Sequence, residues 1–154
     1  MAGEYYSNSR QHLMAELGRV DLMIRARVRQ ARKVRSPGNP FAGLCISEEE
    51  VEALLAQPSG LPSWAGFPLG GSIPELQPAL EGLTAEIEQR KAGSRQKGIS
   101  LRFDELSTLF HLTPLEAETI LVGLAPELDL RYERLYAYLQ DDVSQKRPRV
   151  DLVL

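Results

Sequence analysis

The most regular pattern of apolar positions lies near the N-terminus. Apolar side chains recur there every three or four residues, at Leu13, Leu17, Val20, Ile24, Val28, Ala31 and Val34. This spacing predicts a long amphipathic helix within residues 1–35, of about twenty-six residues and roughly 40 Å, whose start Ser7 or Ser9 could cap. The apolar stripe needs a partner surface, and the pattern leaves open whether that surface belongs to the same chain or to a second copy.

The densest apolar pattern lies in residues 99–142, which predict a compact helical core. Apolar residues at helical spacing follow Asp104 and predict a first helix. The apolar residues from Ile99 to Phe103, just before it, could form one short strand. A third helix follows Asp129 and should end near Gln140, because its apolar residues share one face.

The second helix of this core has the clearest start signal. Thr113 precedes Pro114 and stands three residues before Glu116, which is a capping box with proline at the first helical position. The helix should run from about Pro114 to about Ala125, because the ring of Pro126 ends or kinks a helix. Its apolar residues surround most of its circumference and therefore predict a helix buried against its neighbours: Leu115, Ile120, Leu121, Val122 and Leu124.

Two further helices complete the prediction of one all-α domain of about six helices. Ser47 and Glu50 form another capping box, which predicts a helix that ends near Gln57. Residues from Glu75 to about Ala92 have one apolar face and predict a helix that ends in a flexible turn at residues 93–98.

A loop rich in proline and glycine, residues 58–74, separates these two helices. It is too long for a mere connector in a compact domain. Its aromatic residues either cover the core or anchor a partner, since exposed aromatic side chains make strong interface contacts. Trp64 and Phe67 are therefore candidate partner-binding residues.

Charge is distributed very unevenly in this chain of 154 residues, although its formal net charge is only -3. Residues 10–35 carry eight cations and two carboxylates, whereas residues 99–142 carry three arginines and nine carboxylates. The two halves could attract each other. The basic end of the first helix is either a solvated helix terminus or a contact for an acidic partner, which makes Arg25, Arg29 and Arg32 candidate partner-binding residues.

The helices on either side of Thr113 have the outline of a helix-turn-helix unit that reads DNA. In such units the second helix contacts phosphates and base edges with arginine, lysine, asparagine or glutamine. The segment from Pro114 to Ala125 has no cation and two glutamates, so its charge opposes binding to a phosphate backbone.

No catalytic set can be assembled from the remaining residues. His12, next to the apolar stripe, is interpreted as a surface or packing residue, and His111, at a helix turn, as a capping or solvated one. The single Cys45 excludes an internal disulfide and a cysteine zinc site. We therefore expect no catalytic, cofactor-binding or metal-binding residue and no enzyme activity.

Three runs of residues resemble the N-terminal region of a group of bacterial AAA+ ATPases: Leu124 to Asp129, Arg131 to Asp142 and Arg147 to Leu152. The segments from Ser7 to Ser9 and from Leu44 to Val51 resemble the corresponding segments of that group. Some of its members are associated with phage-tail-like contractile injection systems. The region before their ATPase is described as a winged-helix-like or helical module.

The resemblance implies that residues 1–154 form one non-catalytic N-terminal domain, with residues 147–154 as the start of a truncated following element. The motor itself is absent. Gly93 and Gly98 have the spacing of a phosphate loop, but Ile99 and Ser100 stand where lysine and serine or threonine are required. ATP and magnesium are therefore implied only for a full-length protein, which the resemblance also implies to be a homo-oligomer.

Two classes of function remain. The first is a protein-interaction or assembly domain that positions partner or substrate proteins for the rest of its own ATPase chain. The alternative is a nucleic-acid-binding module with a helix-turn-helix or a basic helix, although nucleic acid is the less favoured partner. We expect a cytoplasmic protein without membrane contact, because no apolar run approaches the roughly twenty residues of a membrane span and no signal peptide precedes the first helix.

Overall fold

The computed structural model describes residues 4–34 and 76–153, and within these ranges all regular structure is helical. The prediction of an all-α fold is therefore confirmed. The elements, in chain order, are α1 (Ser9–Val34), α3 (Leu76–Gln96), α4 (Arg102–Leu109), α5 (Pro114–Leu128), α6 (Arg131–Leu139) and α7 (Val150–Val153). The helix predicted from Ser47 to Gln57, Cys45 and the loop at residues 58–74 lie outside the described residues.

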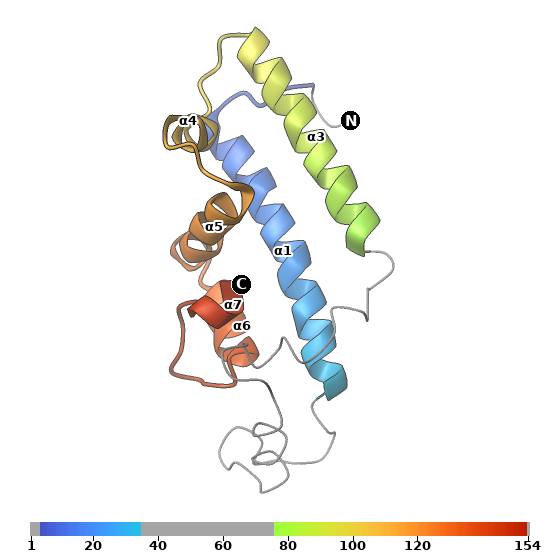
Figure 1. Ribbon diagram of the computed structural model, residues 1–154, viewed down its shortest axis with the longest axis vertical. Coiled ribbons are helices and arrows are strands. Elements are labelled where there is room, and N and C mark those ends of the chain that lie inside the picture. Colours follow the sequence, from blue (N-terminus) through green and yellow to red (C-terminus); the bar gives the residue numbers. More distant parts are fainter. Residues whose placement is uncertain (1–3, 35–75, 154) are drawn as a thin grey trace, which may run out of the picture.

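The long helix α1 runs through the middle of the described structure (Figure 1). It lies antiparallel to α3 on one side, and α4, α5 and α6 follow one another along its other side. The predicted length of α1 is confirmed at 26 residues. Its first turn is capped by Asn8, whose side-chain oxygen accepts from the Gln11 amide at 3.0 Å, so Ser7 and Ser9 were the wrong candidates.

The apolar stripe of α1 finds its partner surface within the same chain. Its central residues are buried in one cluster with residues of α5 and α6: Leu17, Val20, Ile24, Leu121, Ala125, Tyr132 and Tyr136. Each such side chain contributes about 1.5–3 kcal/mol when it leaves water. The stripe is therefore occupied where it is described, and it does not need a second copy.

The predicted start of α5 is confirmed in detail. The Glu116 amide donates to the Thr113 hydroxyl at 3.3 Å, and the Thr113 amide donates to the Glu116 carboxylate at 2.7 Å. These bonds from the Thr113 backbone and side chain hold the pKa of Glu116 below its ordinary value. The capping box thus fixes the direction in which α5 leaves the turn.

The predicted end of α5 is wrong, because the helix continues through Pro126 to Leu128. Proline has no amide hydrogen, so the Val122 carbonyl, four residues earlier, has no regular helical partner. The Tyr136 hydroxyl of α6 donates to that carbonyl at 2.8 Å. Burial raises the pKa of this hydroxyl, which therefore keeps its proton. A tertiary hydrogen bond has replaced the missing helical one.

The predicted end of α3 is also wrong, because the helix continues through Gly93 to Gln96. A Cβ atom at Gly93 would lie 2.5 Å from the Glu4 carbonyl oxygen, so glycine lets the N-terminal strap, residues 4–8, approach the helix. Next to it, the Ser94 hydroxyl accepts from the Tyr6 amide at 2.8 Å. The turn itself is confined to Lys97 and Gly98, whose φ of +68° favours glycine.

The predicted strand from Ile99 to Phe103 is absent from the described residues, and Arg102 and Phe103 begin α4 instead. A strand needs a second strand for its backbone hydrogen bonds. Here the side chain of Ser9 takes that role: its hydroxyl donates to the Ser100 carbonyl at 3.2 Å and accepts from the Arg102 amide at 3.1 Å. The segment is tied to the start of α1.

The segment after α6 is organised by one side-chain amide. Gln140, which ends α6, donates to the Arg147 carbonyl at 3.0 Å and accepts from the Arg149 amide at 2.9 Å. Leu152 of α7 then packs against the core. The prediction that residues 147–154 begin a further element stays a prediction.

Removing the Tyr136 hydroxyl should leave unpaired the Val122 carbonyl that Pro126 cannot bond. Tyr136→Phe leaves the Val122 carbonyl without a donor and should lower the free energy of unfolding by about 1–3 kcal/mol. In a Pro126→Ala background residue 126 supplies an amide hydrogen, so the same change should cost clearly less. Urea denaturation of the four proteins measures this difference. Tyr132→Phe is the control, because its hydroxyl contacts only Arg131 among the described residues. An equal loss of unfolding free energy from Tyr136→Phe in both backgrounds would refute the idea that Tyr136 compensates for Pro126.

Gly93→Ala should destabilise the protein although alanine is the better helix former. The added methyl group collides with the Glu4 carbonyl and must displace the strap, which should outweigh the roughly 1 kcal/mol gained in helix propensity. Gly82→Ala is the matched control in the same helix, since nothing lies within 4 Å of its Cβ position. In thermal unfolding, Gly93→Ala should have a lower melting temperature than the parent protein, and Gly82→Ala a higher one.

Candidate interaction surface

Helices α4 and α5 form the predicted helix-turn-helix-like unit. The turn between them is closed by backbone bonds from Phe110 to the Leu106 carbonyl at 3.0 Å and from Leu112 to the Ser107 carbonyl at 2.9 Å, with His111 at a φ of 51°. This turn holds three large apolar side chains in solvent. Leu109, Phe110 and Leu115, the α4–α5 corner, are 73%, 64% and 49% exposed.

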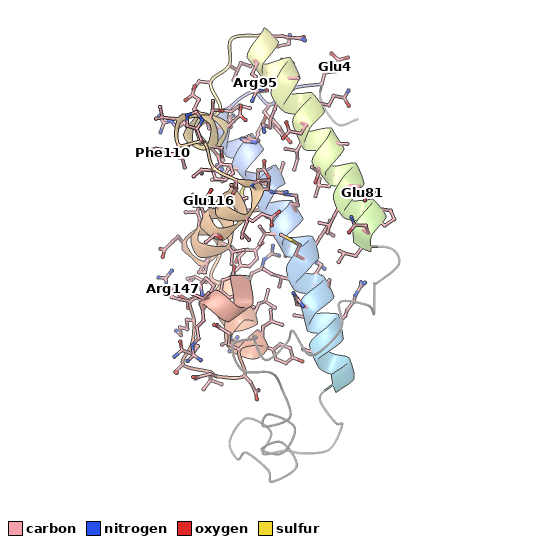
Figure 2. The ribbon with its side chains drawn as sticks, viewed as in Figure 1. Glu4, Glu81, Arg95, Phe110, Glu116 and Arg147 are labelled. Atoms are coloured by element: carbon pink, nitrogen blue, oxygen red, sulfur yellow. The ribbon has the colours of Figure 1, made fainter. Side chains whose placement is uncertain are left out.

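The corner lies on the edge of the molecule away from α3, where Figure 2 shows Phe110 beside α4. Leu115 was predicted to be buried, because apolar residues surround most of its helix, whereas Leu109 and Phe110 served only to predict the helix before it. The consecutive pair Leu109 and Phe110 at a helix end was the missed signal, since neighbouring helical positions point in different directions.

Helix α5 is buried on one side only. Leu121 and Ala125 are fully buried, whereas Ile120 is 38% exposed and Glu116, Gly123 and Glu127 are exposed. The prediction that this helix is buried around most of its circumference is therefore wrong. Its neighbours among the described helices are α1, α6 and α7, and they leave several of its side chains in solvent.

The exposed side of α4 and α5 is acidic. Residues 103–130 include six carboxylates and no lysine or arginine. Cations from elsewhere in the chain neutralise part of this charge: Arg19 lies 3.1 Å from Glu118, and Arg147 pairs with Glu127. Glu105 and Glu116 instead accept hydrogen bonds from the hydroxyls of Ser100 and Thr113. The expected attraction between the basic and acidic halves is thus realised in the Arg19 pair.

The sequence model of the family described as "Winged helix domain, variant" matches residues 2–154. The chain belongs to this family. The winged-helix-like character implied by the sequence resemblance is therefore shown, and the helix-turn-helix unit of α4 and α5 accords with it. No curated protein and no solved structure matches the chain. These comparisons do not connect the winged-helix domain with AAA+ ATPases, with contractile injection systems or with a bacterial source.

An acid–base cluster holds α4 of the winged-helix domain against α3. Asp104, near the start of α4, is almost buried and lies 2.9 Å from the Lys91 ammonium and 2.6 Å from the Arg95 guanidinium. Burial alone would raise the pKa of Asp104, but the hydrogen bonds and charges of Lys91 and Arg95 outweigh it and lower that pKa. The start of α4, the helix that leads into the corner, is therefore fixed against α3.

A buried polar chain links the strap, α1 and α5. His12 is fully buried between the rings of Tyr6 and Phe103, and its Nε2 lies 3.2 Å from the Glu16 carboxylate. Burial would raise the pKa of Glu16, but the His12 hydrogen bond and the Arg19 charge lower it overall. The interpretation of His12 as a packing residue is confirmed. Sequence reasoning missed Glu16, although its spacing from His12 and Arg19 was a usable signal.

Of the residues selected from the sequence as partner-binding candidates, the structure describes the side chains of Arg25 and Arg29, and both lie on α1 rather than at the corner. Arg25 pairs with Asp21 at 2.6 Å, and Asp21 also contacts Arg131 of α6, while Arg29 is exposed further along α1. The side chain of Arg32 lies outside the described part of α1. Trp64 and Phe67 lie outside the described residues as well.

The structure of residues 4–34 and 76–153 also bears on membrane insertion and metal binding. No helix there combines the length and apolarity that a membrane crossing requires. No three histidine, cysteine, aspartate or glutamate side chains in these ranges gather in a way that could hold a metal ion.

Removing the Asp104 charge should destabilise the protein in a pH-dependent way. Because the folded-state pKa is lowered, the ionised carboxylate stabilises the fold above the ordinary value of about 3.9, and this contribution disappears as the pH falls through the folded-state value. Asp104→Asn should cost about 1–2 kcal/mol at pH 7.

The free energies of unfolding of the parent and of Asp104→Asn should converge below about pH 4. Glu88→Gln is the control, because Glu88 contacts the same Lys91 from an exposed position and should cost less than about 0.5 kcal/mol. A penalty for Asp104→Asn that stays constant with pH would contradict the assigned ion pair.

Proposed function

We propose that this winged-helix domain is a non-catalytic protein-interaction and assembly domain. Winged-helix domains typically bind DNA or proteins. The observation that carries the proposal is the exposed side of α5, which presents Glu116 and Glu127 without a lysine or arginine from its own helix.

Electrostatics favour protein over DNA at this surface. A helix placed in the major groove lies between two phosphate backbones, and binding gains much of its free energy when cationic side chains release counterions. Glu116 and Glu127 would meet phosphates of like charge, and the only cation that contacts either of them in the described residues is Arg147 at Glu127. The apolar α4–α5 corner adds area suited to protein side chains.

A finer proposal places the domain in the N-terminal part of a bacterial AAA+ ATPase. The support is the sequence resemblance of residues 124–142, which contain both Pro126 and the Tyr136 that compensates for it. In this proposal the domain positions partner or substrate proteins for a motor that binds ATP and magnesium, as part of a cytoplasmic homo-oligomer that could serve contractile injection systems. Nucleotide-binding motifs encoded after Leu154 would support it, and a reading frame without them would refute it.

A second candidate function is nucleic-acid binding through the basic end of α1. The exposed position of Arg29 favours it, and Arg25 is also exposed although it is paired with Asp21. The described part of this helix end offers few unpaired cations, so protein binding remains the better-supported function.

An electrophoretic mobility assay with duplex and single-stranded DNA separates the two functions. We expect no shift at about 150 mM salt, where exposed charges more than about 8 Å apart are screened. A shift that weakens steeply with salt and disappears in Arg25→Ala/Arg29→Ala would favour the second candidate. Arg10→Ala, at the other end of α1, is the matched control and should behave like the parent protein.

A further inference from the structure

The α4–α5 corner exposes apolar surface that the described helices leave uncovered. Leu109, Phe110 and Leu115 are close in sequence on both sides of one tight turn, and each is largely exposed. Single exposed apolar residues are ordinary, whereas three large ones within seven residues of chain indicate an interaction site. Because a rival explanation would be a poorly held turn, the rigidity of the corner matters.

The corner is held in place from three directions. The capping box of Thr113 and Glu116 fixes the start of α5, and the backbone bonds of Phe110 and Leu112 close the turn. Asp104, five residues before Leu109 on α4, is bound by two cations of α3. A surface held in this way loses little conformational freedom when it binds a partner.

The charges around the corner define the chemistry of its occupant. Glu105 lies one turn before Leu109 on α4, Glu116 directly follows Leu115, and both are exposed. No lysine or arginine occurs in residues 103–130, and within the described part of the chain both carboxylates accept hydrogen bonds from hydroxyls rather than from cations. The complementary surface is therefore apolar in its centre and cationic at its edge.

We propose that the α4–α5 corner binds a cationic amphipathic helix of a partner protein, an inference that rests on the proposed protein-interaction function. The apolar side of that helix packs on Phe110 and Leu115, and its lysines or arginines lie beside Glu105 and Glu116. Helices commonly dock in this way through one apolar face. An extended peptide would add to a strand edge, and the described residues contain no strand.

The basic helix of a second copy is a weaker occupant. The chain carries such a helix in α1, but the apolar stripe of α1 is already buried against α5 and α6. A second copy could offer its arginines to the corner without an apolar face to cover Phe110. A helix from another protein therefore fits the corner better than a second copy does.

Fluorescence anisotropy with labelled model peptides tests this inference. The probe is a leucine–lysine amphipathic helix of about eighteen residues, or five turns. Its controls are a peptide of the same composition in scrambled, non-amphipathic order and a leucine–glutamate helix. We expect the leucine–lysine helix to bind at least tenfold more tightly than either control, with an affinity that falls as salt is raised.

Variants locate the binding site. Phe110→Ser should weaken binding of the leucine–lysine helix at least tenfold, whereas Val143→Ser, at an apolar residue that is 91% exposed outside α4 and α5, should leave it unchanged. Glu116→Gln should weaken it several-fold, because the variant loses a negative charge beside the lysines of the probe. Glutamine can still complete the capping box, so the start of α5 is kept. Glu81→Gln on α3 is the matched control. Circular dichroism verifies that each variant remains folded.

Each outcome decides between the inference and the function on which it rests. Equal binding of the probe to Phe110→Ser and to the parent, or equal binding of the scrambled or acidic peptide, overturns the inference and leaves the proposed function standing. Self-association in sedimentation that Phe110→Ser abolishes also overturns it, because a second copy then occupies the corner. An electrophoretic shift of duplex DNA by the parent protein that Phe110→Ser abolishes overturns both, because DNA then occupies the corner.

Discussion

The hydroxyl of Tyr136 supplies the hydrogen bond on which the arrangement of α5 and α6 depends. Pro126 removes one amide from α5, and a helix normally ends near such a residue. The bond from Tyr136 to the Val122 carbonyl lets α5 run to Leu128 and holds α6 against it at the same time. Tyr136 and Pro126 are both buried, so the Val122 carbonyl receives its hydrogen bond inside an otherwise apolar cluster.

The same logic recurs at the other end of the molecule, where small or polar side chains replace regular structure. Gly93 removes a side chain so that the strap can reach α3, and Ser94 then binds the strap backbone. The Ser9 hydroxyl bonds the carbonyl of Ser100 and the amide of Arg102, two groups that a second strand would have bonded in a sheet. With α1 between these two ends, the apolar stripe fixes which helices are neighbours, and a few polar contacts fix where each one stops.

Local rules predicted the helices well and their ends unevenly. The spacing of apolar residues located α1, and the Thr113 capping box located the start of α5, because both depend on residues within a few positions of each other. The ends at Pro126 and Gly93 were misplaced since the deciding partners, Tyr136 and Glu4, come from distant parts of the chain. The exposure of the α4–α5 corner was missed for a related reason. Apolar residues at helical spacing predict a helix, but only the neighbouring helices decide whether each of those residues is buried. Arg25 and Arg29 were identified by charge alone, and the four-residue spacing from Asp21 to Arg25, which signals their ion pair on a helix, was not used.

The strap also has a consequence for the order in which the polypeptide acquires its structure. Tyr6 is bonded to Ser94, 88 positions later, and Ser9 to Ser100, 91 positions later. On a ribosome the strap emerges before Ser94 and Ser100 and must wait for them, and closing such long loops costs entropy that local helices do not lose. The strap is therefore among the last described segments to dock, and it is exposed to proteases and chaperones until then.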